Sequence, residues 1–160
     1  MANKVKSEGG INLAQGIPAY DPPKELLNIL EKIVHNNIHQ YAAGRGNMKL
    51  LEQLEKHYNI PANQFLIVNG ATEAISLLVT YLKKIITDNF SVLSFDPVYE
   101  SYKHLPRIFN LPFINFQLNS NSEIEFNALE ESIIQNNVKL ILLASPGNPL
   151  GKVWTENEVI

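Results

Sequence analysis

The sequence predicts an α/β fold in which a mainly parallel β-sheet lies between two layers of helices. From residue 65 onward, short apolar runs alternate with amphipathic segments, which is the pattern of strands joined by crossover helices. Parallel neighbouring strands need such long connections, and the connecting helices cover both faces of the sheet. Two helical patterns precede the first apolar run, so a helical part comes before the sheet.

The N-terminal part is predicted to contain a short arm and two amphipathic helices. The segment 21–38 has Pro23 at a plausible first helical position, and the turn-like AAGRGN separates it from a second helical segment at 48–58. Apolar side chains recur at helical spacing in both segments. They are Leu26, Leu30, Ile33, Val34 and Ile38 in the first, and Leu50, Leu51, Leu54 and Tyr58 in the second.

The rest of the chain is predicted to alternate strands and helices. The predicted strands are 65–68, 91–95, 112–118 and 139–145, and the predicted helices are 74–86, 97–109 and 126–137. We expect an interruption of the second of these helices near Pro106, because proline removes a helical hydrogen bond.

Composition narrows the class of protein. The 160 residues are enough for one domain with a real core, and the net charge of -3 is too mild to indicate a nucleic-acid partner or an anionic membrane surface. The chain has no cysteine, which excludes disulfides and thiolate chemistry. No stretch approaches the ~20 apolar residues of a membrane span, and the N-terminus lacks the apolar core of a signal peptide. We therefore expect a cytoplasmic protein whose partners are small molecules or other proteins.

The C-terminal residues predict the start of one more helix. Thr155 followed by Glu158 is the pattern of a capping box. Only a few residues follow before Ile160, too few for a helix that supports itself. We therefore expect the chain to be the N-terminal part of a longer protein.

Ligands of open parallel sheets bind beyond the carboxyl ends of the strands, so the loops there are candidate sites. In NGATEA, the backbone at Gly70 can approach a ligand, and the amides of Ala71 and Thr72 with the Thr72 hydroxyl could cradle a phosphate at a helix N-terminus. Taken alone, this loop is better explained as an Asn-Gly turn with Thr72 as the N-cap. In DPVYESY, Tyr99 and Tyr102 could hold a planar cofactor or simply belong to the core.

Several familiar motifs are excluded. Gly147, Gly151 and Lys152 approximate a Walker phosphate loop, but the spacing is one residue short and Val153 replaces the hydroxyl that binds the metal. No dinucleotide fingerprint follows a strand. The four histidines do not form the His-Glu-x-x-His motif of zinc proteases and are expected on solvated faces; they are His35, His39, His57 and His104.

Five segments, in order, resemble the class I and II aminotransferases, which are pyridoxal-phosphate (PLP) enzymes of fold type I. The segments are INLAQGIPAYDPP, HQYAAGRGNMKLLEQLEKHY, FLIVNGATEAI, FDPVYESY and SPGNPLGKV, the last carrying the family's Asn-Pro-x-Gly-Lys signature. The first and the last most resemble the branch of kynurenine, glutamine and methionine aminotransferases.

The resemblance implies roles for residues around the cofactor. Asn148 would hydrogen-bond the phenolic oxygen of PLP, and Tyr99 would stack on its pyridine ring. Ala71 and Thr72, with the close backbone at Gly70, would bind the phosphate.

Further roles concern the substrate and a second subunit. Gly16 would let the arm approach the substrate carboxylate, and Tyr41 would reach the cofactor phosphate of the neighbouring subunit, which implies a homodimer. Lys152 is not taken for the Schiff-base lysine. The resemblance puts that lysine, and the aspartate that pairs with the pyridine nitrogen, beyond Ile160.

The implied architecture is an incomplete PLP-dependent transferase fold. Residues 1–40 would form the N-terminal arm and a small-domain helix, and residues 41–160 the N-terminal half of the PLP-binding large domain. The full-length protein would move an amino group from methionine, glutamine or an aromatic or kynurenine-like amino acid to a 2-oxo acid, and the segment alone would be almost inactive.

Two other functions stay open at this point. A PLP-dependent carbon-sulfur β-lyase would share these motifs and would differ by releasing pyruvate. A non-catalytic PLP-binding module of a transcriptional regulator would require a DNA-binding domain before Met1, and the short arm argues against that.

Overall fold

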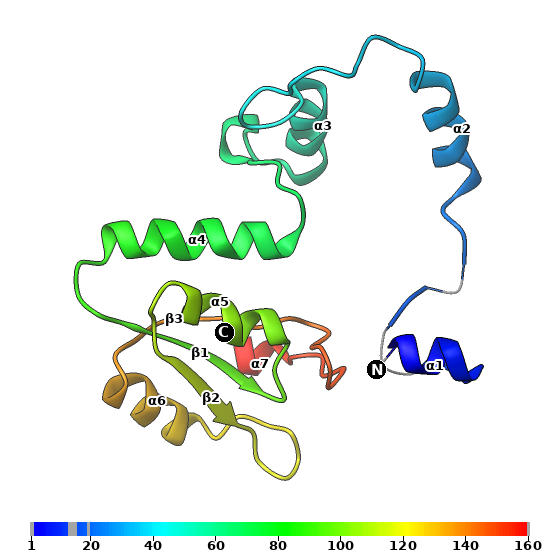
Figure 1. Cartoon of the computed structure of the whole chain (residues 1–160). Coiled ribbons are helices and arrows are strands. Elements are labelled where there is room, and N and C mark those ends of the chain that lie inside the picture. Colours follow the sequence, from blue (N-terminus) through cyan, green and yellow to red (C-terminus); the bar gives the residue numbers. More distant parts are fainter. Residues whose placement is uncertain (1, 13–15, 19, 160) are drawn as a thin grey trace. The chain divides into compact units, whose positions relative to one another are not determined.

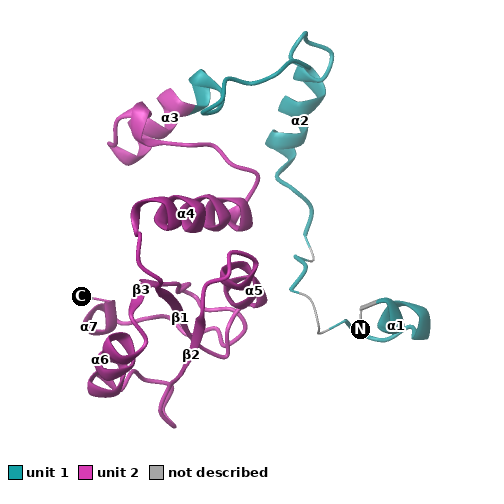
Figure 2. Cartoon of the chain, turned by 60° about the vertical axis from the view of Figure 1, so that its left-hand side comes forward, with its two compact units in different colours: residues 1–50 teal, residues 51–160 magenta. Residues whose placement is uncertain are grey.

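The computed structural model describes residues 2–12, 16–18 and 20–159 (Figure 1). The chain divides into two compact units, residues 1–50 and residues 51–160 (Figure 2). The division falls inside helix α3 (Met48–Tyr58). The predicted domain boundary after residue 40 stays a prediction.

Unit 1 contains two helices before α3. Helix α2 (Lys24–Ile33) confirms the predicted first amphipathic helix, with Pro23 at the N-cap and not inside the helix. Helix α1 (Ala2–Glu8) precedes α2 and was not predicted from the sequence. Gly9 ends α1 in a left-handed conformation (φ 70°), where the amide of Gly10 donates to the carbonyl of Val5 at 3.1 Å. Residues 13–15 and 19 of the predicted arm lie outside the described residues.

Unit 2 is built on a three-stranded parallel sheet. Its strands are β1 (Ser91–Asp96), β2 (Phe113–Gln117) and β3 (Val138–Ile141), in the order β2-β1-β3. The predicted parallel sheet with crossover helices is therefore confirmed. The central strand β1 pairs with both neighbours, so the segments after β1 and β3 leave the sheet at the same edge.

Helices cover both faces of this sheet (Figures 1 and 2). They are α4 (Ala71–Ile85), α5 (Glu100–Ile108) and α6 (Phe126–Gln135). On one face, Val92 of β1 belongs to a core cluster with Val79 of α4. On the other face, Leu93 and Phe95 belong to a cluster with Leu129 of α6. Successive side chains of β1 thus enter opposite cores, which confirms the predicted three layers.

The predicted strand at 65–68 was wrong. These residues follow a short 3-10 helix, η1 (Ala62–Gln64), and lead into α4 without strand pairing. A strand needs a neighbour for its backbone hydrogen bonds, and within the described part of the chain residues 65–68 pair with none of the three strands β2, β1 and β3. Leu66 is 52% exposed, so the apolar run does not mark a buried strand here.

Two predicted boundaries also change. Strand β3 ends at Ile141, although the apolar run continues to Ser145, because the chain turns there into a loop. Pro106 does not interrupt α5 but lies buried two residues before its end. Its carbonyl accepts hydrogen bonds from the amides of Phe109 and Leu111, at 3.1 and 2.9 Å, and so closes the helix.

The last helix, α7 (Glu156–Val159), begins where the capping-box pattern predicts. Within the described parts of the chain, none of the helices combines the length and the apolar character that a membrane crossing would need.

Candidate functional site

A pocket lies at the carboxyl ends of β1 and β3. Its walls come from the end of β1 and the following turn, from Tyr102 and Leu118, and from the loop after β3. Tyr99 and Asn148, two residues that the sequence singles out, both line it, although 48 residues of chain separate them. The empty space between these walls is about 360 Å³, which includes the part that is open to solvent on one side.

Asn148 sits at the tip of a tight loop. The amide of Gly147 donates to the carbonyl of Lys152 at 2.8 Å, and the amide of Gly151 donates to the carbonyl of Gly147 at 2.6 Å. Gly151 has a φ of 71°, a conformation that glycine adopts without strain. The two ends of the loop are thereby joined by backbone hydrogen bonds, with Asn148 between them.

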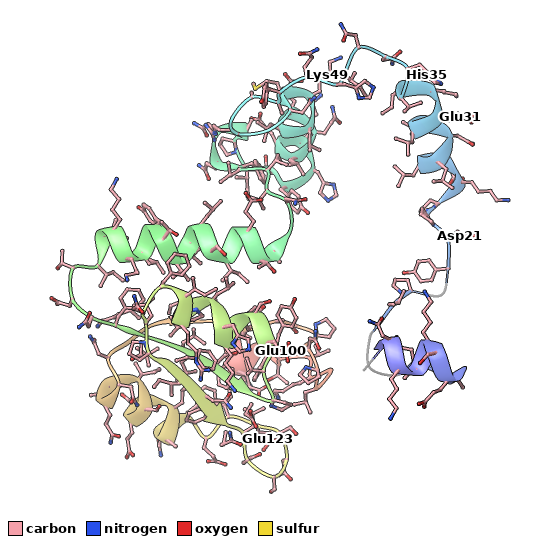
Figure 3. All side chains as sticks on the ribbon, in the orientation of Figure 1. Asp21, Glu31, His35, Lys49, Glu100 and Glu123 are labelled. Atoms are coloured by element: carbon pink, nitrogen blue, oxygen red, sulfur yellow. The ribbon has the colours of Figure 1, made fainter. Side chains whose placement is uncertain are left out.

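Tyr99 is the N-cap residue of α5, beside the first helical residue Glu100 that Figure 3 labels. Its ring meets the ring of Tyr102 edge to face, with 5.6 Å between the centroids. Tyr99 is 38% exposed, so it is not a closed core residue. Tyr99 and Tyr102 both line the pocket, so their contact forms part of its wall.

The base of the pocket is held by polar contacts that the sequence did not single out. The hydroxyl of Ser94, buried in β1, donates to the carbonyl of Leu142 at 2.7 Å. The indole N–H of Trp154 donates to the carbonyl of Ala144 at 2.8 Å, and its ring lies 4.8 Å from that of Phe95. A serine in an apolar strand and the only tryptophan of the chain were the available signals.

Lys152 lines the pocket but its ammonium group is engaged. Its Nζ lies 2.8 Å from Oε1 of Glu158 and 4.8 Å from the centroid of the Trp154 ring. The backbone amide and the hydroxyl of Thr155 both donate to Oε2 of Glu158 at 3.0 Å, and the first of these bonds is one half of the predicted capping box. The other half is absent, because the amide of Glu158 donates to the backbone carbonyl of Thr155 at 3.0 Å and not to its hydroxyl. The hydrogen bond from Lys152, followed by that from the Thr155 backbone, lowers the pKa of Glu158 to about 2.

The turn before α4 has a different cap from the one considered in the sequence. Gly70, with a φ of 100°, is the N-cap residue, and Thr72 lies in the first helical turn, so Thr72 is not the N-cap. A side-chain oxygen of Glu73 accepts a hydrogen bond from the amide of Asn69. Ala71 and Thr72 are exposed at the positive end of the helix, and neither lines the pocket.

The two predicted residues of unit 1 are both exposed. Gly16 has open space where a Cβ would stand, and Tyr41 has a fully exposed side chain. Their predicted contacts with substrate and with a neighbouring subunit stay predictions.

Metal-ligating side chains do not gather anywhere in the described ranges: there is no group of three or more His, Cys, Asp or Glu residues that could hold an ion.

Comparisons with known proteins match nearly the whole chain. The family model for aminotransferase class I and II matches residues 8–159. The chain is 30% identical over 125 residues to the histidinol-phosphate aminotransferase of Buchnera aphidicola subsp. Cinara cedri, which covers 78% of this chain and 34% of that relative. It is 28% identical over 166 residues to kynurenine–oxoglutarate transaminase 3 of Mus musculus, covering 93% of this chain and 36% of that relative.

A solved structure is similar in fold as well. YbdL from Escherichia coli, reported with a methionine aminotransferase function, superposes with a TM-score of 0.83 at 25% identity. The match covers 98% of this chain and 43% of YbdL. The chain thus spans less than half the length of these relatives.

Proposed function

The chain belongs to the class I and II aminotransferases, and on that premise we propose that the full-length protein is a PLP-dependent aminotransferase. The observation that carries the proposal is the shared pocket of Tyr99 and Asn148 at the carboxyl edge of the sheet. PLP, when bound, supplies an electron sink that stabilises negative charge next to an amino group.

The side chains around the pocket are chemically suited to this cofactor. An aromatic face and an amide are the contacts that a flat, oxygen-bearing heteroaromatic ring needs. The cofactor ring would enter through the open side of the pocket. The residues fit one wall of a PLP site.

In this proposal Asn148 donates a hydrogen bond from its amide to the phenolic oxygen of the cofactor, and Tyr99 covers one ring face. Ala71, Thr72 and the backbone at Gly70 receive the phosphate, which is supported by their exposure at the positive end of α4.

We also propose that Gly16 lets the backbone approach the substrate carboxylate and that Tyr41 serves the site of a second subunit in a homodimer. The amino donor is proposed to be methionine, glutamine or an aromatic or kynurenine-like amino acid, with a 2-oxo acid as acceptor. Methionine and kynurenine are supported by the names of similar proteins. Cytoplasmic location remains a prediction of the composition.

The test is an amino-transfer assay on the full-length protein purified with PLP, using these amino donors and 2-oxoglutarate. Asn148→Ala should lower kcat/KM roughly 10- to 100-fold, the effect of losing a hydrogen bond to a charged oxygen. Asn127→Ala, which removes an exposed amide from α6, should leave the rate unchanged and serves as the matched control. The 160-residue chain alone should show almost no turnover.

Two results would contradict the proposal. Equal amino-transfer rates for Asn148→Ala and the unchanged protein would show that Asn148 does not contact the cofactor. Release of pyruvate without amino transfer would instead support a carbon-sulfur β-lyase.

A further inference from the structure

The structure offers a second set of side chains next to Asn148 that the proposed function does not use. At the base of the loop that carries Asn148, Lys152 contacts both Trp154 and Glu158. We name these three residues the loop clasp. We propose that the loop clasp positions Asn148 toward the cofactor, an inference that rests on the proposed function.

The first step concerns the backbone of Lys152. Its carbonyl accepts the hydrogen bond from the amide of Gly147, the residue directly before Asn148. Movement of Lys152 would therefore move Gly147, and with it the Asn148 side chain. The position of Asn148 depends on whatever holds Lys152.

The second step concerns the side chain of Lys152. Its ion pair with Glu158 is mostly shielded from water, since the two side chains are only 14% and 10% exposed. Such a pair is less screened than one at an open surface. Glu158 is in turn fixed by the two hydrogen bonds from Thr155, so the ion pair ties Lys152 to the start of α7.

The third step concerns Trp154, which connects the chain after the Asn148 loop to the chain before it. Trp154 donates its indole N–H to Ala144 and its backbone N–H to the hydroxyl of Ser145, at 2.8 and 3.2 Å. Its ring packs on Phe95, in the strand that leads to Tyr99. The loop clasp therefore connects the residues on both sides of the Asn148 loop to the end of β1.

These contacts define Lys152 as a positioning residue. Its ammonium group lies against Glu158 and the Trp154 ring, so its influence on the cofactor passes through the loop. A positioning role predicts that the effect of changing Lys152 disappears once the Asn148 side chain is gone.

The experiment titrates PLP into the full-length apoprotein and measures the Kd and the absorbance maximum of the bound cofactor. Lys152→Met and Glu158→Gln should each raise the Kd roughly fivefold, the upper range for a partly exposed ion pair, and the double variant should be no weaker than either. Lys152→Arg should bind like the unchanged protein. The matched controls are Lys139→Met and Glu156→Gln, both exposed, which should leave the Kd unchanged.

The decisive comparison combines Lys152→Met with Asn148→Ala. Asn148→Ala alone should weaken PLP binding and shift the absorbance maximum, and Lys152→Met should shift it in the same direction. Adding Lys152→Met to Asn148→Ala should cause no further loss of PLP affinity.

The outcomes separate the two proposals. If Asn148→Ala weakens PLP binding while Lys152→Met does not, the positioning role of the loop clasp is wrong and the proposed function stands. The same conclusion follows if the losses of PLP affinity in the two variants add. If the unchanged protein does not bind PLP, or Asn148→Ala does not change PLP binding, the proposed function is wrong. The positioning role of the loop clasp is then wrong as well. Unfolding midpoints from circular dichroism identify any variant that weakens PLP binding only by unfolding. If Lys152→Met is such a variant, Lys152→Arg decides, because the inference requires it to bind PLP like the unchanged protein.

Discussion

Strand β1 and helix α2 both carry several large apolar side chains but bury them to opposite extents. Val92 and Leu93 of β1 are completely buried in two different cores. Helix α2 has no buried residue, and Leu30 on its apolar side is 54% exposed. The helical period is enough to form α2, whereas a core forms only where a paired sheet brings several elements together.

The largest effect in this comparison should come from the same truncation in the two regions. Leu93→Ala removes methyl groups from a completely buried side chain and should lower the free energy of unfolding by about 2–5 kcal/mol. Leu30→Ala changes a half-exposed site and should stay within about 0.5 kcal/mol. Urea denaturation of both variants of this chain checks the contrast. Equal losses would show that α2 belongs to a core.

A smaller effect is expected from two serine hydroxyls that each donate to a backbone carbonyl. Ser94 donates to Leu142 inside the sheet core, and Ser7 donates to Lys4 on the exposed helix α1. Ser94→Ala leaves a buried carbonyl without its partner and should cost about 1–3 kcal/mol. Ser7→Ala, the matched control, should cost almost nothing, because water replaces the lost bond. A stable Ser94→Ala variant would contradict the importance of this bond.

The smallest effect should come from the pH dependence of Glu158 in unit 2. Its pKa falls from an ordinary 4.5 to about 2 in the folded chain, so it stabilises the fold fully above about pH 4.5 and loses that contribution as pH falls toward 2. Glu158→Gln should therefore reduce the drop in urea midpoint across this window. Glu156→Gln should keep the drop of the unchanged chain. Identical curves for Glu158→Gln and the unchanged chain would contradict the ion pair with Lys152.

The layered part of the fold was predictable because the sequence patterns that indicate it are local and recur along the chain. Alternating apolar runs and amphipathic helices predicted a parallel sheet covered on both faces, and the spacing of Thr155 and Glu158 predicted a helix start. The segment 65–68 shows the limit, because an apolar run does not reveal whether a neighbouring strand is available. Thr72 shows another: the conformation of Gly70 decided which residue caps α4.

The candidate site was predictable to a similar degree. Topology brought Tyr99 and Asn148 to one pocket, since loops after neighbouring parallel strands share an edge. The engagement of Lys152 was not predictable, because its partner lies six residues away across a turn and follows no helical spacing. The sequence alone assigned Lys152 no role.

The most direct test of the central claim is the crystal structure of the full-length protein with PLP bound. We predict the cofactor ring against Tyr99, with the side-chain amide nitrogen of Asn148 within about 3 Å of the phenolic oxygen. The phosphate should lie at the first turn of α4. A cofactor bound away from the edge formed by β1 and β3, or an Asn148 side chain turned away from the ring, would contradict the account.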